Sequence, residues 1–194
     1  MNYMSDMQLL VRCHLKLGDW QLNMADSRLS EEVIRPVLDT YSTATSLSDT
    51  HYKAWHSWAI MNFQVAEHYL AEKKEASVVA AYLAAALKAF FHSVTLGQGR
   101  ATGEVLQDLL RLLTLWFTHG AMPAVHAVLE SGLNSVRVST WLQVIPQLIA
   151  RIHVPTTQIR NMLYNLLARV GRHHPQVQQS VGAFGGCLCC SAMM

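Results

Sequence analysis

Histidine and cysteine are the first candidate metal ligands in this chain, and their spacing indicates whether they form a metal site. The 194 residues include ten histidines. His51 and His56 are five positions apart, which points them to different faces of a helix. A glycine and a proline separate His119 from His126, and no His-Glu-x-x-His pattern occurs. The spacing favours ordinary surface or half-buried histidines over a zinc site.

The four cysteines are distributed unevenly. Cys13 stands alone, whereas Cys187, Cys189 and Cys190 crowd the C-terminal end. A structural zinc site needs a second pair of ligands, which is missing, so palmitoylation or an incidental role is left for this cluster. The pattern is not a disulfide framework, and it predicts a reduced, cytosolic setting.

Catalytic and nucleotide-binding motifs are absent from the sequence. The glycines at 97, 99 and 103 superficially resemble a phosphate loop, but their spacing fails the dinucleotide pattern and no Gly-Lys-Ser/Thr follows. No Gly-x-Ser-x-Gly, Asp-Phe-Gly or His-Arg-Asp sequence occurs. We therefore assign no catalytic, cofactor-binding or metal-binding residue, and whether the chain is an enzyme in its own right is left open.

Composition and charge allow a folded core. Half of the chain is apolar (51%) and only 14% is charged, which argues against general disorder. All acidic residues lie at or before Glu130, and five arginines follow it. These arginines favour solvated helix faces over a nucleic-acid surface, because no aromatic-basic patch accompanies them. The charge-free stretch 112–129 contains histidine, glycine and proline, which argues against a membrane span.

Apolar residues recur with the 3.6-residue period throughout, which predicts an all-α fold. Gly18 is predicted to end the first helix, at residues 3–17. Pro146 is predicted to bend the seventh helix, at residues 139–152. Residues 95–103 are rich in glycine and predict a linker, whereas residues 178–194 are uncharged and aperiodic and predict a disordered tail. The expected helices span residues 3–17, 30–44, about 50–66, 75–94, 104–118, 123–133, 139–152 and from Pro155 onward.

The apolar stripes predict which side chains face a core. The last four helices form two hairpins whose starts lie roughly 35 residues apart, the spacing of TPR- or HEAT-like repeats, so we expect an α-solenoid. The inward positions are predicted to be Tyr52, Trp55, Ala59, Phe63 and Ala66; Leu106, Leu109, Leu110, Leu113 and Trp116; Leu142, Ile145, Leu148, Ile149 and Ile152; and Ile159, Met162, Leu163, Leu166, Leu167 and Val170.

Five segments resemble the FAT region of the target-of-rapamycin (TOR) protein kinases, across residues 13–177. One characteristic helix of that family is resembled by residues 52–63, Tyr-Lys-Ala-Trp-His-Ser-Trp-Ala-Ile-Met-Asn-Phe. The family is resembled as closely by residues 141–152, Trp-Leu-Gln-Val-Ile-Pro-Gln-Leu-Ile-Ala-Arg-Ile. Shorter resemblances occur at 13–20, 112–117 and 171–176. We therefore interpret residues 1–177 as one FAT-like helical-repeat segment.

The resemblance implies a regulatory role. In this family the FAT region is a solenoid that wraps the kinase domain of the same polypeptide, and the parent enzyme phosphorylates serine and threonine in nutrient and growth signalling. The implied partners are that kinase domain and the WD-repeat and helical-scaffold subunits of TOR complexes. ATP and Mg²⁺ are implied for the parent kinase only. The implied location is cytoplasmic, with the family also at endomembranes and in the nucleus.

The family continues into a rapamycin-binding bundle and a kinase domain, and here the resemblance ends near Val177. We expect from this a partial or mis-spliced product whose tail is translated non-coding sequence. The alternative is a free-standing helical interaction module without catalysis. A stable, monodisperse isolated chain would favour that alternative, whereas aggregation would favour a fragment of a longer solenoid.

Overall fold

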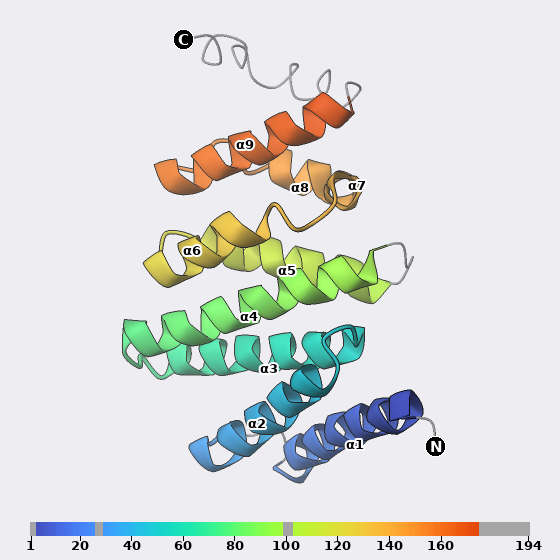
Figure 1. The fold of residues 1–194 in the computed structure, drawn as a ribbon. Coiled ribbons are helices and arrows are strands. Elements are labelled where there is room, and N and C mark those ends of the chain that lie inside the picture. The colour runs from blue at the N-terminus through green and yellow to red at the C-terminus, as the bar shows by residue number, and fades with distance from the viewer. Residues whose placement is uncertain (1–2, 26–28, 99–102, 175–194) are drawn as a thin grey trace. The chain divides into compact units, whose positions relative to one another are not determined.

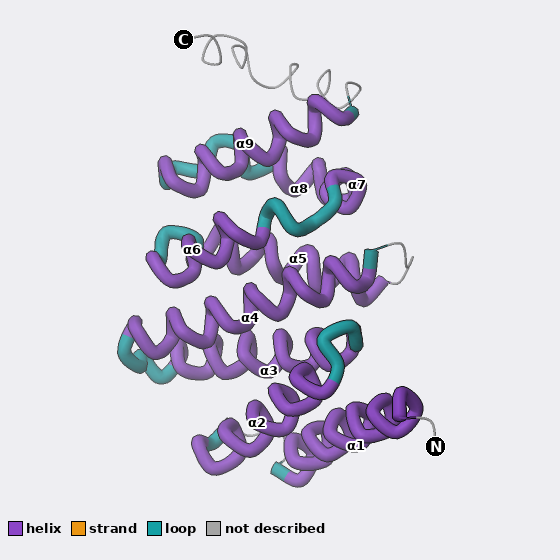
Figure 2. The backbone as a smooth tube through the Cα atoms, viewed as in Figure 1, coloured by secondary structure: helices purple, strands orange, loops and turns teal. Residues whose placement is uncertain are grey.

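The computed structural model describes residues 3–25, 29–98 and 103–174. Within these ranges the regular structure is entirely helical, which confirms the predicted all-α class (Figure 2). The chain divides into two compact units, Met1–Ser135 and Val136–Met194. The first unit thus contains the expected linker near residues 95–103. The predicted tail at 178–194 lies outside the described residues.

The first unit is a stack of helices in chain order (Figure 1). Each helix packs against the next, and α4 also packs against α6, so that α4 has neighbours in α3, α5 and α6. This stacking of successive helices is the organisation of helical-repeat proteins and confirms that prediction for the first unit. Its helices are α1 (Tyr3–Met24), α2 (Glu31–Leu47), α3 (Tyr52–Ala71), α4 (Ala76–Gly97), α5 (Gly103–His119) and α6 (Pro123–Gly132).

Gly18 does not end the first helix, as its sequence context predicted, but lies inside α1. A Cβ atom at this position would lie 2.4 Å from Cε1 of Tyr41 in α2. The missing side chain therefore lets the Tyr41 ring lie directly against the α1 backbone. The Tyr41 hydroxyl then donates a hydrogen bond to Asp19 Oδ1 (3.0 Å), which ties α2 to α1 beside the glycine.

The predicted inward face of α3 is partly correct. Tyr52, Ala59 and Ala66 are buried, whereas Trp55 and Phe63 are only half-buried. The Trp55 indole stacks on the His92 ring at a centroid distance of 4.1 Å and donates a hydrogen bond to the Asp49 carbonyl (2.7 Å). These two aromatic residues thus lie at the rim of the core, where each contacts a ring of α4.

Helix α4 is the most apolar element of the first unit. It continues to Gly97, so the predicted linker is shorter than residues 95–103; residues 99–102 lie outside the described ranges. By length and composition it is the one described helix able to cross a membrane, but 50% of its most apolar window is buried in the fold. Because three helices of the same unit cover it, we interpret α4 as a core helix.

The second unit departs from prediction in one place. Residues 139–152 do not form one bent helix but three short pieces, α7 (Val138–Trp141), the 3-10 helix η1 (Leu142–Val144) and α8 (Ile145–Ile149). Val144 leaves the helical region (φ −123°, ψ 17°), and Pro146 lies in the first turn of α8. Proline lacks the N–H of a helix interior and its ring collides with the preceding turn, so the helix restarts instead of bending.

Helix α9 (Thr157–His173) follows the prediction closely. Of its six predicted inward residues only Met162 is half-buried, and the other five are buried. In the segment before it, Ile145, Leu148 and Ile152 are buried, whereas Leu142 and Ile149 are half-buried. The second unit therefore has its own apolar core, built by α9 and the broken helix that precedes it.

Leu148→Asp is expected to destabilise this core. Leu148 is fully buried, and an unpaired carboxylate in its place loses apolar burial and hydration together, a cost of about 4 kcal/mol. Gln147→Asp, at the exposed neighbouring position, is the matched control. Thermal unfolding followed by circular dichroism should show a lower midpoint for the first variant only. An equal midpoint for both variants would contradict the assigned face.

Candidate functional site: a buried aspartate

Asp108 is the buried charged residue of the described core, with no exposed surface. The predicted inward face of α5 is wrong in detail, because Leu106 and Leu110 are exposed (37% and 36%). The buried face is instead turned by about one position, so that it includes Asp108. Its members are Val105, Asp108, Leu109, Leu112, Leu113, Leu115 and Trp116.

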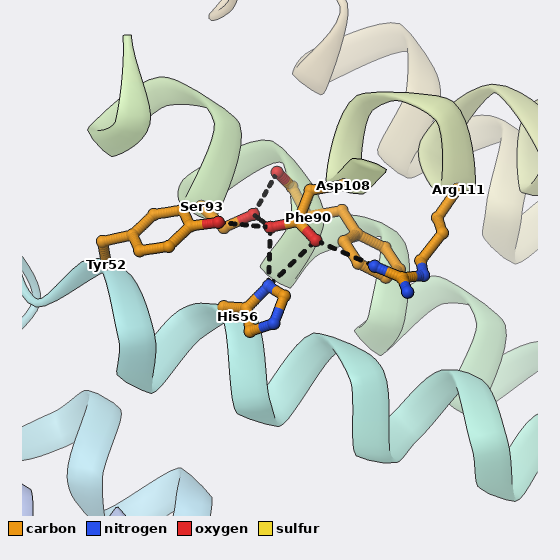
Figure 3. A network of polar contacts seen from close by, with 6 residues as sticks. All are labelled: Tyr52, His56, Phe90, Ser93, Asp108 and Arg111. Atoms are coloured by element: carbon orange, nitrogen blue, oxygen red, sulfur yellow. Dashed lines mark hydrogen bonds and ion pairs between the residues drawn. The ribbon is translucent and has the colours of Figure 1, made fainter. Parts of the chain in front are cut away.

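Donors from three helices surround the Asp108 carboxylate (Figure 3). From α3, the Tyr52 hydroxyl donates to Oδ2 (3.2 Å), and His56 Nδ1 lies 2.9 Å from both oxygens. From α4, Ser93 Oγ donates to Oδ2 (2.9 Å) and also contacts the Phe90 carbonyl (3.0 Å). Since a carboxylate only accepts, the shared hydrogen of the histidine contact must be on Nδ1.

Two members of the network, Arg111 and His56, are partly exposed to solvent. Arg111, one turn along α5, places Nη1 3.5 Å from Oδ1 with its side chain 36% exposed, and His56 is 26% exposed. Ser93 and Asp108 are fully buried. The carboxylate is thus compensated by hydroxyl and ring N–H donors inside and by a guanidinium at the edge, as a buried charge requires.

The environment of Tyr52 keeps its phenol neutral. Burial raises the pKa of Tyr52 above the ordinary value of 10, and the negative charge of Asp108 and the hydrogen bond to it raise the pKa further. The ring also stacks on His56 at 5.7 Å. A neutral hydroxyl is the form that donates to the carboxylate, so the pKa shift and the hydrogen bond favour the same state.

The combination of serine, histidine and aspartate is not a nucleophilic triad. In a triad the histidine bridges the other two, accepting from serine through one nitrogen and donating to aspartate through the other. Here Ser93 and His56 both contact the same carboxylate. Ser93 is also fully buried, out of reach of a substrate. The arrangement is suited to joining helices rather than to acyl transfer.

The Asp108 carboxylate is not free to bind a cation. No group of three histidine, cysteine or acidic side chains lies close enough there to hold a metal ion. The two Asp108 oxygens already accept from four side chains, which leaves no lone pair directed at a cation. His56, one of the histidines whose spacing was tested for a zinc site, contacts Asp108 instead.

Comparison with protein families finds a match to the FAT domain over residues 2–114, more than half of the chain. The chain belongs to the FAT domain family. All side chains of the Asp108 network lie inside the matched residues, from Tyr52 to Arg111. The network is thus a feature of the FAT part of the chain.

Among curated proteins, FAT regions of TOR kinases are similar to this chain. Serine/threonine-protein kinase tor1 of Schizosaccharomyces pombe is 44% identical over 171 residues, which cover 86% of this chain. Serine/threonine-protein kinase TOR of Arabidopsis thaliana is 39% identical over 89% of it, and serine/threonine-protein kinase mTor of Drosophila melanogaster 36% over 88%. The chain spans only 7–8% of the length of these relatives.

Asp108→Ala is expected to destabilise this FAT segment by about 3 kcal/mol, because the buried donors Tyr52 and Ser93 and the half-buried His56 lose their acceptor while little apolar burial is gained. Asp39→Ala, an exposed helical aspartate, is the matched control. Urea unfolding monitored by circular dichroism measures the difference. A change in the Asp108 variant no larger than in the control would show that the network contributes no stability.

Alkaline titration tests the state of Tyr52. Because its pKa is raised in the fold, the folded state binds a proton that the unfolded state releases near pH 10, so stability falls as pH rises above 10. Tyrosinate absorbance of wild type and Tyr52→Phe should coincide in native protein near pH 10. In urea the wild type should show one additional tyrosine titrating there. A difference already present in native protein would contradict the buried phenol.

Proposed function

We propose that this chain is a scaffolding and regulatory segment of a TOR-type serine/threonine kinase, with no chemistry of its own. The observation that carries the proposal is the FAT match combined with the TOR kinases that resemble most of the chain. The Asp108 network supports it, since a side-chain joint between stacked helices holds a rigid surface. Such a surface would position the kinase domain of the same parent polypeptide.

The proposed partners follow from the relatives and not from a docked surface. They are the kinase domain in cis, together with the WD-repeat and helical-scaffold subunits of TOR complexes. ATP and Mg²⁺ would bind to that kinase domain, because the relatives are serine/threonine-protein kinases. The proposed location is cytoplasmic, with endomembrane and nuclear pools as in the family.

A chimera tests the positioning role. The matching segment of the Schizosaccharomyces pombe tor1 kinase is replaced by this chain's residues 1–174, and kinase activity is measured in the purified complex. We expect the chimera to be active and Asp108→Ala within it to lower kcat severalfold, because the joint that holds α5 against α3 and α4 is lost. Asp39→Ala should leave kcat unchanged.

The contrary outcomes are distinct. An active chimera whose kcat does not respond to Asp108→Ala would contradict a positioning role for the joint. An inactive chimera that assembles normally would contradict the equivalence of this chain to the tor1 segment. The size and the subunit content of the purified complex are measured in each case, because a misfolded chimera would not assemble into a complex of normal size and content.

A second candidate function is a free-standing helical interaction module. It is favoured by one specific observation, the apolar face that α1 leaves exposed. In that case binding, and not the positioning of a kinase domain, would be the activity of the chain.

A further inference from the structure

The turn between α3 and α4 presents a serine that follows two lysines. Its sequence is Lys73-Lys74-Glu75-Ala76-Ser77, so positive charges lie three and four residues before the Ser77 hydroxyl. Many serine/threonine kinases select substrates by such charge patterns, because acidic side chains in their peptide groove bind basic side chains at a fixed distance from the acceptor hydroxyl. The spacing is therefore that of a substrate for a kinase that selects basic residues.

The structure leaves this whole segment accessible. All residues from 71 to 78 are exposed. They form the turn in which α3 ends and α4 begins, and Ser77 lies in the first turn of α4 (Figure 2). The Ser77 hydroxyl donates a hydrogen bond to Glu75 Oε1 (2.7 Å), a contact within the turn itself. The hydroxyl and the two lysines can thus be reached without opening the core.

Little structure must open for the segment to extend along the groove of a kinase. Hydrogen bonds from the N–H groups of Val78 and Val79 to the Glu75 carbonyl (3.1 and 3.2 Å) hold the first turn of α4. Val78, next to the acceptor, is 40% exposed and loses little burial when this turn opens. Val79 is buried and marks the limit of the extension. Helix ends open locally in this way at a low cost in free energy.

The segment Arg111-Leu112-Leu113-Thr114 of α5 has the same charge spacing but is not accessible. Its hydroxyl residue, Thr114, is exposed, whereas Leu112 and Leu113 between the charge and the hydroxyl are buried (0% and 4%). The Thr114 hydroxyl also donates to the Leu110 carbonyl inside the helix (3.0 Å). A kinase could bind this segment only after α5 had left the core. The fold, and not the spacing, therefore distinguishes the two hydroxyls.

The lysines of the turn are available to a binding partner. Lys74 Nζ lies 3.6 Å from Glu31 and 3.8 Å from Glu72, with its side chain 44% exposed. Exposed ion pairs of this kind contribute little stability, so an acidic groove can replace them at a small cost. Lys73 is exposed at the left-handed residue of the turn (φ 56°). Both positive charges can therefore pair with the acidic groove of a kinase.

We propose that Ser77 is a phosphorylation site for a serine/threonine kinase that selects basic residues before its acceptor. In this step Ser77 Oγ attacks the γ-phosphorus of ATP held by that kinase. The bond from this phosphorus to the bridging oxygen of ADP breaks, and the hydroxyl proton passes to the catalytic base of the kinase. The phosphate then lies in the first turn of α4, where the helix dipole favours negative charge. The proposal is independent of the proposed function, because it concerns the chain as a substrate.

Phosphorylation of the folded 194-residue chain by the catalytic subunit of cAMP-dependent protein kinase, a kinase that selects basic residues, tests the proposal. Tandem mass spectrometry should locate the phosphate on Ser77, and Ser77→Ala should abolish the incorporation. Lys74→Ala removes the charge three residues before the acceptor and should lower the initial rate at least about tenfold. Lys88→Ala, at an exposed position later in α4, should leave the rate unchanged. Equal helical content by circular dichroism shows that each variant is folded.

A synthetic peptide of residues 70–81 separates the motif from its accessibility. Because the segment is exposed in the fold, we expect the initial rate for the folded chain to lie within about tenfold of the rate for the peptide. A larger deficit, or phosphate on Thr114 of the folded chain, would overturn the accessibility argument. Incorporation that persists in Ser77→Ala, or a rate that Lys74→Ala leaves unchanged, would overturn the site itself.

Discussion

Burying the Asp108 carboxylate is the constraint on which the packing of the first unit depends. A charge removed from water is tolerated only where donors reach its oxygens, and here they come from α3, α4 and α5. With apolar side chains alone, neighbouring helices could slide along each other with little loss of stabilising free energy, since apolar attraction has no direction. A shift of α3 or α4 by one helical turn, about 5.4 Å, would separate the Tyr52, His56 or Ser93 donor from the carboxylate on α5. The network therefore sets the register of three helices.

Elsewhere in the first unit, close contacts between a helix backbone and an aromatic ring also fix the position of neighbouring helices. Gly18 admits the Tyr41 ring between α1 and α2, and a Cβ at Gly132 of α6 would lie 2.2 Å from the Phe91 ring of α4. Each contact pairs a glycine with an aromatic ring on another helix, so neither helix can rotate without a collision. A few directional contacts thus turn a generic apolar stack into one defined surface, which is the property that a scaffolding segment needs.

The FAT family match and the geometry of the Asp108 network are independent observations, and both fit a helical-repeat segment. The family match rests on sequence, whereas the Asp108 network shows an acid, a histidine and a serine that join three helices. Among the described residues, α1 also carries exposed apolar side chains, including Leu17, Trp20 and Met24.

The periodicity and the long motifs of the sequence determined the helical class, the helix that follows Pro123, the core face of α9 and the family, because apolar spacing and local motifs are read directly from neighbouring residues. Tertiary structure decided what depends on distant partners. Gly18 is internal because Tyr41, 23 residues later, packs on it, and the face of α5 is turned because Tyr52, His56 and Ser93 supply donors to Asp108. Because its side chain is charged, an aspartate within a leucine-rich helix is expected from the sequence to lie on the solvent-exposed face. Only the folded chain brings together the hydrogen bonds that make its burial favourable.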